Sequence, residues 1–354
     1  MTTGESAARS RAWRSLEVEV AFRAAVAAVV PLAILVLAGR PDLAPYAAFG
    51  GMAAIFGRGE RYRVRARTVI VAATGLVVSV AAGTALAAAS APLWVEAIVL
   101  VAVIAGGVVV VNVAPLSPPT TLFFVFGLLV CAQVPTPAGE LVLRIGIAVV
   151  SAAFAVALTL SGWLLRRFGG EATRAVLKDL PRAPAPRPGA VRDPHVWLSV
   201  GQNGAGALVA GALALAFGPG HPYWAVVSVI AVVPPAGAAH SLSRAVHRVL
   251  GTLGGVVVAA LVLWPAPPAW LLVLVVGVAQ FGAEILVGRH YGAALLCITP
   301  LALVVAWIAA PVDLGGLVAD RVIETVVGCA VGVAAVLVGS GVARRLGGRA
   351  GVAG

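Results

Sequence analysis

Long apolar runs, separated by short segments of arginine, proline and glycine, occupy most of this chain. A run of about 20 apolar residues is long enough to cross a lipid bilayer as an α-helix. The runs therefore predict an all-α polytopic membrane protein with about 12 transmembrane helices. The first six helices are expected at about 21–38 and 44–56, then one that ends near 89, one at 94–113, one that ends near 134, and one at 140–165. The seventh is expected at about 196–217, and the last five begin near 223, 244, 270, 291 and 317.

The second half of the chain repeats landmarks of the first half. Tyr46 and Tyr223 each follow a proline, and they lie 177 positions apart, as do Arg144 and Arg321. The recurrence extends, at offsets of 176 to 181, to Trp94 and Trp270, to Arg166-Arg167 and Arg344-Arg345, and to the pairs Arg63/Arg67 and Arg244/Arg248. Such periodicity indicates duplication. We expect two six-helix repeats. Because each has an even number of helices, both repeats start on the same side of the membrane, so they are parallel and related by an axis along the membrane normal.

The predicted organisation has five parts and no soluble domain. They are a basic cytoplasmic lead-in at 1–20, a first six-helix repeat at 21–167, a cytoplasmic Pro- and Arg-rich linker at 168–195, a second six-helix repeat at 196–345, and a cytoplasmic tail at 346–354.

Composition supports a membrane location and argues against a nucleic-acid partner. Hydrophobic residues make up 61% of the 354 and charged residues only 11%, against about a quarter charged in ordinary soluble domains. The net charge is +11, but the arginines lie at the ends of apolar runs, where they set topology. With both termini in the cytoplasm, nearly all of them fall on the cytoplasmic side. We therefore expect a multi-pass protein of the bacterial plasma membrane, without a cleavable signal.

Motifs for enzymatic chemistry are absent from the sequence. The three cysteines lie inside apolar runs, and no pair has metal-ligand spacing. The glycine-rich segment that begins at Gly251 lacks the lysine of a nucleotide-binding loop. The sequence predicts no enzymatic activity, no cofactor and no metal, so active transport would require an ion gradient or a partner. It leaves the oligomeric state open, a homo-oligomer included.

The stretch at 219–255 carries the most specific pattern. It contains HPYWAV, then the double proline Pro234-Pro235, then RAVHRVLGTLGG. This pattern resembles the fusaric-acid-resistance-like family of integral membrane transporters, which looks related to aromatic-acid exporters and, more distantly, to aluminium-activated malate channels. The first half carries a degraded copy of it.

The resemblance implies export of small organic anions, such as aromatic carboxylates, driven by protons. Two alternatives remain open, namely a passive organic-anion channel and a membrane scaffold that transports nothing. The lipid bilayer and a small organic anion are the expected partners.

Charges within the membrane are the best functional candidates, because each costs at least a few kcal/mol to insert. Arg144 and Arg321 are equivalent in the two repeats, so they are expected to face one another across the axis and bind an anion. The alternative is that each pairs locally, Arg144 with Glu140 and Arg321 with Glu324. Glu324 and Glu284 are the candidate proton carriers, or else members of buried ion pairs.

Further candidates follow from helix breaks and basic turns. Broken helices expose backbone groups that can bind substrate, which makes the residues at the breaks candidates. The alternative is that each break is only a loop or a tolerated kink. The substrate-binding set adds Tyr46, Tyr223, Thr120, Pro234 and Pro235 to the two arginines. A second set, which could gather anions in a cytoplasmic vestibule or only anchor the helices, comprises Arg63, Arg67, Arg244 and Arg248. Buried amides, among them Asn112, Asn203 and Gln280, are further polar candidates, and ordinary interhelical hydrogen bonds would explain them equally well.

Overall fold

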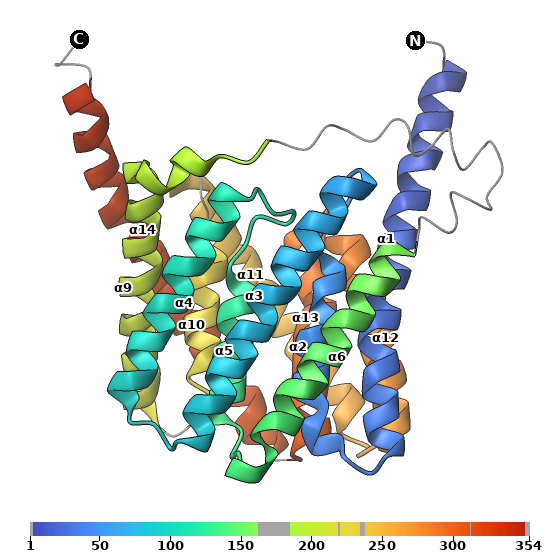
Figure 1. Cartoon of the computed structure of the whole chain (residues 1–354). Coiled ribbons are helices and arrows are strands. Elements are labelled where there is room, and N and C mark those ends of the chain that lie inside the picture. Colours follow the sequence, from blue (N-terminus) through green and yellow to red (C-terminus); the bar gives the residue numbers. More distant parts are fainter. Residues whose placement is uncertain (1–2, 162–184, 219, 234–237, 312, 351–354) are drawn as a thin grey trace.

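The computed structural model is a bundle of long, roughly parallel helices (Figure 1). It describes residues 3–161, 185–218, 220–233, 238–311 and 313–350. In the first half the helices are α1 (Thr3–Leu37), η1 (Pro41–Leu43), α2 (Ala44–Gly51), η2 (Met52–Ile55), α3 (Tyr62–Ala88), α4 (Leu93–Val113), α5 (Leu122–Gln133), η3 (Ala138–Glu140) and α6 (Leu141–Leu160). In the second half they are η4 (Pro188–Arg192), α9 (Pro194–Phe217), α10 (Tyr223–Val232), α11 (Ala238–Leu263), α12 (Ala269–Val287), α13 (Tyr291–Ala309) and α14 (Leu314–Ala350).

The prediction of an all-α membrane protein is confirmed for the described residues, which form 12 α-helices and no strand. Nine of these helices contain an apolar segment long enough to cross a membrane. The other three, α2, α5 and α10, have 8, 12 and 10 residues. Each is too short to cross a bilayer unaided.

The short helices end or begin where the sequence removes helical hydrogen bonds. Pro118 and Pro119 precede α5, so that helix begins only at Leu122. After α2, the backbone tightens into η2 and then turns through Gly57 and Gly59, which both have positive φ. Glycine adopts this left-handed conformation without the strain that a Cβ introduces. The double proline after α10 lies outside the described residues.

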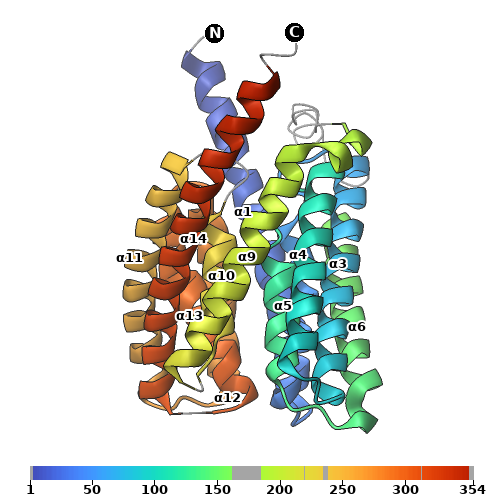
Figure 2. The ribbon, with the colours of Figure 1, turned by 90° about the vertical axis from the view of Figure 1, so that its left-hand side faces the viewer.

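The two halves show matching helix pairings. In the first half α3 packs against α5 and α6, and α2 packs against α6. In the second half α11 packs against α13 and α14, and α10 packs against α14. The halves meet where α1 contacts α12, where α4 contacts α9, and where the short helices α2 and α5 reach α13 and α10. Figure 2 shows the two groups of helices side by side.

Close helix packing depends on small residues at the contacts. A Cβ on Gly328 of α14 would meet the carbonyl oxygen of Ala225 and the side chain of Ser228 on α10. In the matching pair of the first half, the glycine lies on the short helix and not on the long one. A Cβ on Gly50 of α2 would meet Ala148 and Ser151 of α6. Both pairs of helices therefore approach to backbone contact.

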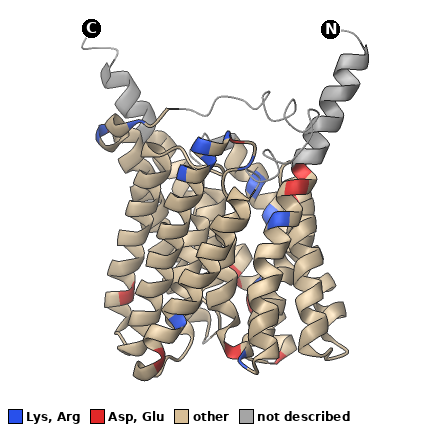
Figure 3. Ribbon diagram, turned by 45° about the vertical axis from the view of Figure 1, so that its right-hand side comes forward, with Lys and Arg blue, Asp and Glu red and all other residues tan. Residues whose placement is uncertain are grey.

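The first turn of α1 and the last turn of α14 lie at the same end of the bundle, which we call the terminus end (Figures 1 and 2). The opposite end is called the far end. Lys and Arg gather mainly toward the terminus end of the described ribbon (Figure 3).

Most predicted helix positions agree with the structure to within a few residues. Three differences stand out. α1 begins at Thr3 and includes the part of the chain expected as a lead-in, and α11 begins at Ala238, six residues before the expected Arg244. α14 continues to Ala350, past the expected boundary of the tail.

Candidate functional site

A cavity of about 480 Å³ lies between the two halves. The three short helices line it, together with parts of α1, α4, α9, α11, α12, α13 and α14. Short helices leave space that full-length helices would fill, so the breaks in the sequence create this cavity. It is the candidate functional site.

The charged side chains that line the cavity are mostly cations. They are Arg58, Arg244, Arg248 and Arg321, against the single carboxylate Glu284. Four positive charges and one negative charge leave a formal excess of three positive charges. Like charges within a membrane repel one another across a low dielectric, so an anion in the cavity would be attracted electrostatically.

Arg321 is the most deeply buried of these cations, with 2% of its surface exposed. Its Nε and Nη1 have no hydrogen-bond partner among the described residues. Its guanidinium carbon lies 3.8 Å from the centre of the Trp224 ring, a cation–π contact. Position 317, four residues earlier on the same helix face, is a leucine and supplies no carboxylate, and Glu324, three residues later, forms no ion pair with Arg321 among the described residues. The Nε1 of Trp224 is also buried without a partner.

Aromatic rings from both halves meet beside Arg321. Phe126 of α5 lies 5.1 Å from the ring of Trp224 and 6.2 Å from that of Tyr223, centre to centre. Tyr223 and Trp224 are themselves 4.7 Å apart. All three line the cavity. The site thus combines an unpaired cation with an aromatic surface, which suits a planar organic anion.

Arg244 and Arg248 converge on Tyr291 from α11. Arg248 donates from Nη1 to the Tyr291 hydroxyl at 2.9 Å and from Nε to the Ser228 hydroxyl at 3.0 Å. Arg244 donates from Nε to the carbonyl of Ala231 at 3.0 Å and lies over the Tyr291 ring. These partners are neutral, so both positive charges remain without a neutralising carboxylate in these contacts.

Arg58 joins the two halves across the cavity. It follows the first short helix, and its Nη2 donates to Oε2 of Glu284 on α12 at 2.6 Å and to that residue's carbonyl oxygen. Gln280 donates to the other carboxylate oxygen at 3.3 Å. A second ion pair between the halves joins Arg289 to Glu17 at 2.6 Å. Both pairs belong to the terminus end, whereas the other ion pairs of the described residues each lie within one half.

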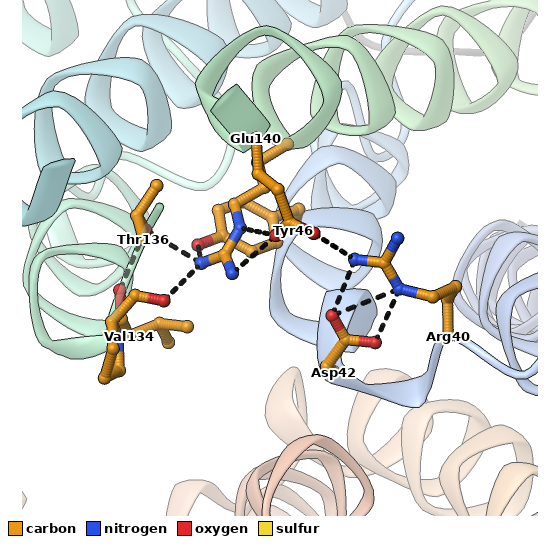
Figure 4. Close-up of polar contacts among 8 residues, drawn as sticks. Arg40, Asp42, Tyr46, Val134, Thr136 and Glu140 are labelled. Atoms are coloured by element: carbon orange, nitrogen blue, oxygen red, sulfur yellow. Dashed lines mark hydrogen bonds and ion pairs between the residues drawn. The ribbon is translucent and has the colours of Figure 1, made fainter. Parts of the chain in front are cut away.

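Arg144 lies outside the lining of the cavity, and each of its three guanidinium nitrogens has a hydrogen-bond partner. Figure 4 shows its neighbours Tyr46, Thr136 and Glu140 close to Arg40 and Asp42. The Nε and Nη2 of Arg144 donate to Glu140, and its Nη1 donates to the Tyr46 hydroxyl, the Thr136 hydroxyl and the carbonyl of Pro135. The local pairing with Glu140, one of the two alternatives for Arg144, is therefore present. The expected counterpart for Arg321, an ion pair with Glu324, is absent from the described residues.

The Arg144 cluster continues to the surface through Arg40. Arg40 bridges Glu140 at 2.8 Å and Asp42 at 2.9 Å. Its guanidinium holds the pKa of Asp42 below its ordinary value through the hydrogen bonds between them. The cluster fastens the turn before α2 to the start of α6.

Glu324 is buried on α14, and its Oε2 has no hydrogen-bond partner among the described residues. It faces the backbone at the first turn of α10, around Trp224 and Ala225. One turn nearer the far end, Asp320 Oδ2 lies 2.9 Å from Nδ1 of His221. Glu324 thus has a more exposed acid–histidine pair beside it.

The remaining candidates divide between the cavity and the surface. Thr120 and Tyr223 line the cavity, as do the amides Asn112, Asn203 and Gln280. Tyr46 is buried against Arg144 instead. Arg63 and Arg67 are exposed on α3, away from the cavity lining, and Pro234 and Pro235 lie outside the described residues.

Four participants are not among the candidate site residues of the sequence analysis, namely Arg58, Phe126, Trp224 and Tyr291. Arg58 stood among five arginines in ten residues, and only its position directly after a broken helix distinguished it. Phe126 lies in a uniformly apolar run that carries no comparable signal. The described residues contain no group of three or more His, Cys, Asp or Glu side chains arranged to hold a metal.

Comparison with known proteins agrees with the resemblance drawn from the sequence. Residues 208–335 match the family described as fusaric acid resistance protein-like. A curated relative, the uncharacterized membrane protein YvaC of Bacillus subtilis (strain 168), is 30% identical over 141 residues. That alignment covers 40% of this chain and 22% of YvaC, so the similarity spans under a quarter of the relative's length. No solved structure matches this chain.

Proposed function

Since the chain carries a fusaric acid resistance-like region within a polytopic helical bundle, we propose that it transports small organic anions across the bacterial plasma membrane. Arg321 is the anion anchor of the central cavity. The observation that carries this proposal is a deeply buried guanidinium with two unpaired nitrogens in a cavity lined by four arginines and one carboxylate. The aromatic rings beside it favour substrates with a ring, such as aromatic carboxylates.

We propose that the two halves are parallel six-helix repeats with the cavity on their common axis. The matching helix pairings and the landmarks at a nearly constant offset support this arrangement. The repeats have diverged in function. Arg144 is saturated by Glu140, Tyr46 and their neighbours, whereas its counterpart Arg321 is not. Only the second repeat then keeps its arginine for substrate.

Proton-coupled efflux is the direction and energy source that we propose, with both termini in the cytoplasm. Glu324 suits proton carriage better than Glu284, since its Oε2 is unpaired while Glu284 is held by Arg58. The His221–Asp320 pair beside Glu324 would connect it to the solution at the far end. Arg244 and Arg248 form the cytoplasmic approach to Arg321.

Uptake of radiolabelled benzoate into inverted membrane vesicles tests the proposal. We expect uptake that depends on a pH gradient and is lost in Arg321→Ala, with equal amounts of protein in the membrane. Arg144→Ala is the matched variant, and transport per correctly folded molecule should persist in it. Glu324→Gln should remove the dependence on the gradient.

Other outcomes separate the alternatives. Uptake that ignores the gradient but still requires Arg321 would indicate a passive anion channel. Uptake that is unchanged in Arg321→Ala would refute the assignment of the anion site. If a broad panel of organic anions gave no flux with any variant, the membrane scaffold would be the better account.

A further inference from the structure

Trp224 presents a further unused hydrogen-bond donor at the proposed anion site. The residue lies in the first turn of α10, has 1% of its surface exposed and lines the cavity. Its Nε1 has no partner among the described residues. A buried indole N–H usually finds an acceptor, because leaving it unpaired costs free energy. An unpaired one that lines a cavity points to a missing ligand.

The indole and the guanidinium of Arg321 are in direct contact. The guanidinium carbon sits 3.8 Å from the ring centre, so the contact uses the face of the indole. The N–H group lies on the edge of the ring, which that contact leaves free. Nε and Nη1 of Arg321 and Nε1 of Trp224 are thus three unpaired donors on two touching side chains. A carboxylate has two oxygens and about four acceptor positions, enough for all three donors.

The first half of the chain shows what such a set of donors requires. Arg144 uses its donors on a carboxylate, two hydroxyls and a carbonyl from the protein itself. At the position that corresponds to Trp224, directly after the Pro-Tyr pair, the first half has Ala47. The indole donor and the unsatisfied arginine therefore occur together in the second half and are both missing from the first.

We propose that Trp224 is a specificity-determining residue whose indole N–H donates to the oxyanion bound at Arg321, while its face holds the guanidinium in place. This inference rests on the proposed transport of organic anions. It adds that the site recognises two oxygens of one acidic group, so a neutral ligand with the same ring is discriminated against. Phe126 packs on the same indole from the other half, and so holds its orientation.

The test measures binding of benzoate and of benzamide to the full-length protein in lipid nanodiscs. Trp224→Phe keeps an aromatic face over Arg321 and removes the N–H. A hydrogen bond to a charged group is worth enough that its loss should weaken benzoate binding by about tenfold or more. Benzamide has no charge to stabilise, and its weaker binding should change little. The control is Trp94→Phe, because Trp94 is exposed on the outside of α4.

A spectroscopic signal identifies the donor itself. In protein labelled with ¹⁵N-tryptophan, the indole cross-peak that disappears in Trp224→Phe belongs to this residue. Addition of benzoate should move that peak downfield, and benzamide should move it less. A merely structural role of Trp224 would produce neither the shift nor the difference between the two ligands.

The outcomes distinguish this inference from the proposed function. If Arg321→Gln abolishes benzoate binding while Trp224→Phe binds like wild type, Trp224 is not a donor and only this inference fails. Equal loss of benzoate and benzamide in Trp224→Phe also overturns it, since that result means a packing defect. If Arg321→Gln binds benzoate normally, or the wild type does not bind it, the proposed site itself is wrong and both inferences fall.

Discussion

Replacing Arg144 by methionine should destabilise the protein, whereas replacing Arg321 by methionine should not. Methionine is an unbranched side chain with a helix propensity close to that of arginine, so local helix formation is unaffected. Arg144→Met removes an ion pair that is buried on the arginine side but 30% exposed at Glu140, and three further hydrogen bonds. Loss of one partner of a buried pair costs about 3–5 kcal/mol. Arg40 still neutralises Glu140 at 2.8 Å, so the lower end, about 3 kcal/mol, is expected.

Arg321→Met removes a buried cation that makes no ion pair among the described residues. The variant loses the cation–π contact with Trp224, worth about 2 kcal/mol in a desolvated setting. It also removes the desolvation cost of the charge, which is several kcal/mol. We expect the free energy of unfolding to be unchanged or raised by up to about 2 kcal/mol, together with loss of anion binding.

The assay is thermal unfolding in lipid nanodiscs without added anions, followed through reaction of the buried Cys131 and Cys329 with a thiol-reactive dye. Arg321→Met should unfold at the same temperature as wild type or at a higher one. Arg144→Met should unfold at a clearly lower temperature than wild type. If Arg321→Met unfolds at as low a temperature as Arg144→Met, Arg321 is a paired structural residue and not a free cation. Added benzoate should stabilise wild type and leave Arg321→Met unchanged.

Two further predictions concern packing and pH. Gly328→Ala should destabilise the protein by about 1–3 kcal/mol, since its Cβ would meet the carbonyl of Ala225. Gly146→Ala on α6 is the control and should be neutral, because the space around that position is open. Melting temperatures of the two variants test this difference. Burial raises the pKa of Glu60 above 4.5, so the folded state loses stability as pH rises through that raised pKa. Glu60→Gln should therefore gain stability over wild type with rising pH, and identical pH profiles of melting temperature would contradict this account.

Much of the fold could be predicted because membrane helices carry a strong local signal. Long apolar runs and the arginines at their ends placed the helices to within a few residues. The sequence predicts a start at Arg244, where the basic turn meets the apolar run, but α11 begins at Ala238, because a helix can extend past its apolar segment into polar and basic sequence. The beginning of α1 at Thr3 was misjudged for the same reason.

The site was harder to predict, because equivalent sequence positions have unequal surroundings. Arg144 and Arg321 look alike along the chain, and their different hydrogen bonding depends on neighbours such as Glu140 and Leu317, which stand four residues before them. The sequence indicates that Glu140 can pair with Arg144. That Leu317 leaves Arg321 without such a pair becomes important only once Arg321 is known to be buried. The pairing of Arg58 with Glu284 joins residues 226 positions apart, which no local pattern reveals.

The ion pairs between the halves also bear on how the bundle can deform. Arg58–Glu284 and Arg289–Glu17 hold the halves together near one end, and no ion pair of the described residues crosses between them at the other. If the halves tilt as rigid bodies, displacement grows with distance from the fastened end, so the far end separates most. The Arg289–Glu17 pair is also half-exposed, and dissolved salt screens exposed charges over about 8 Å at physiological ionic strength. The stiffness of the fastened end should therefore depend on the salt concentration on that side of the membrane, while the Arg144 cluster keeps the first half rigid at the other.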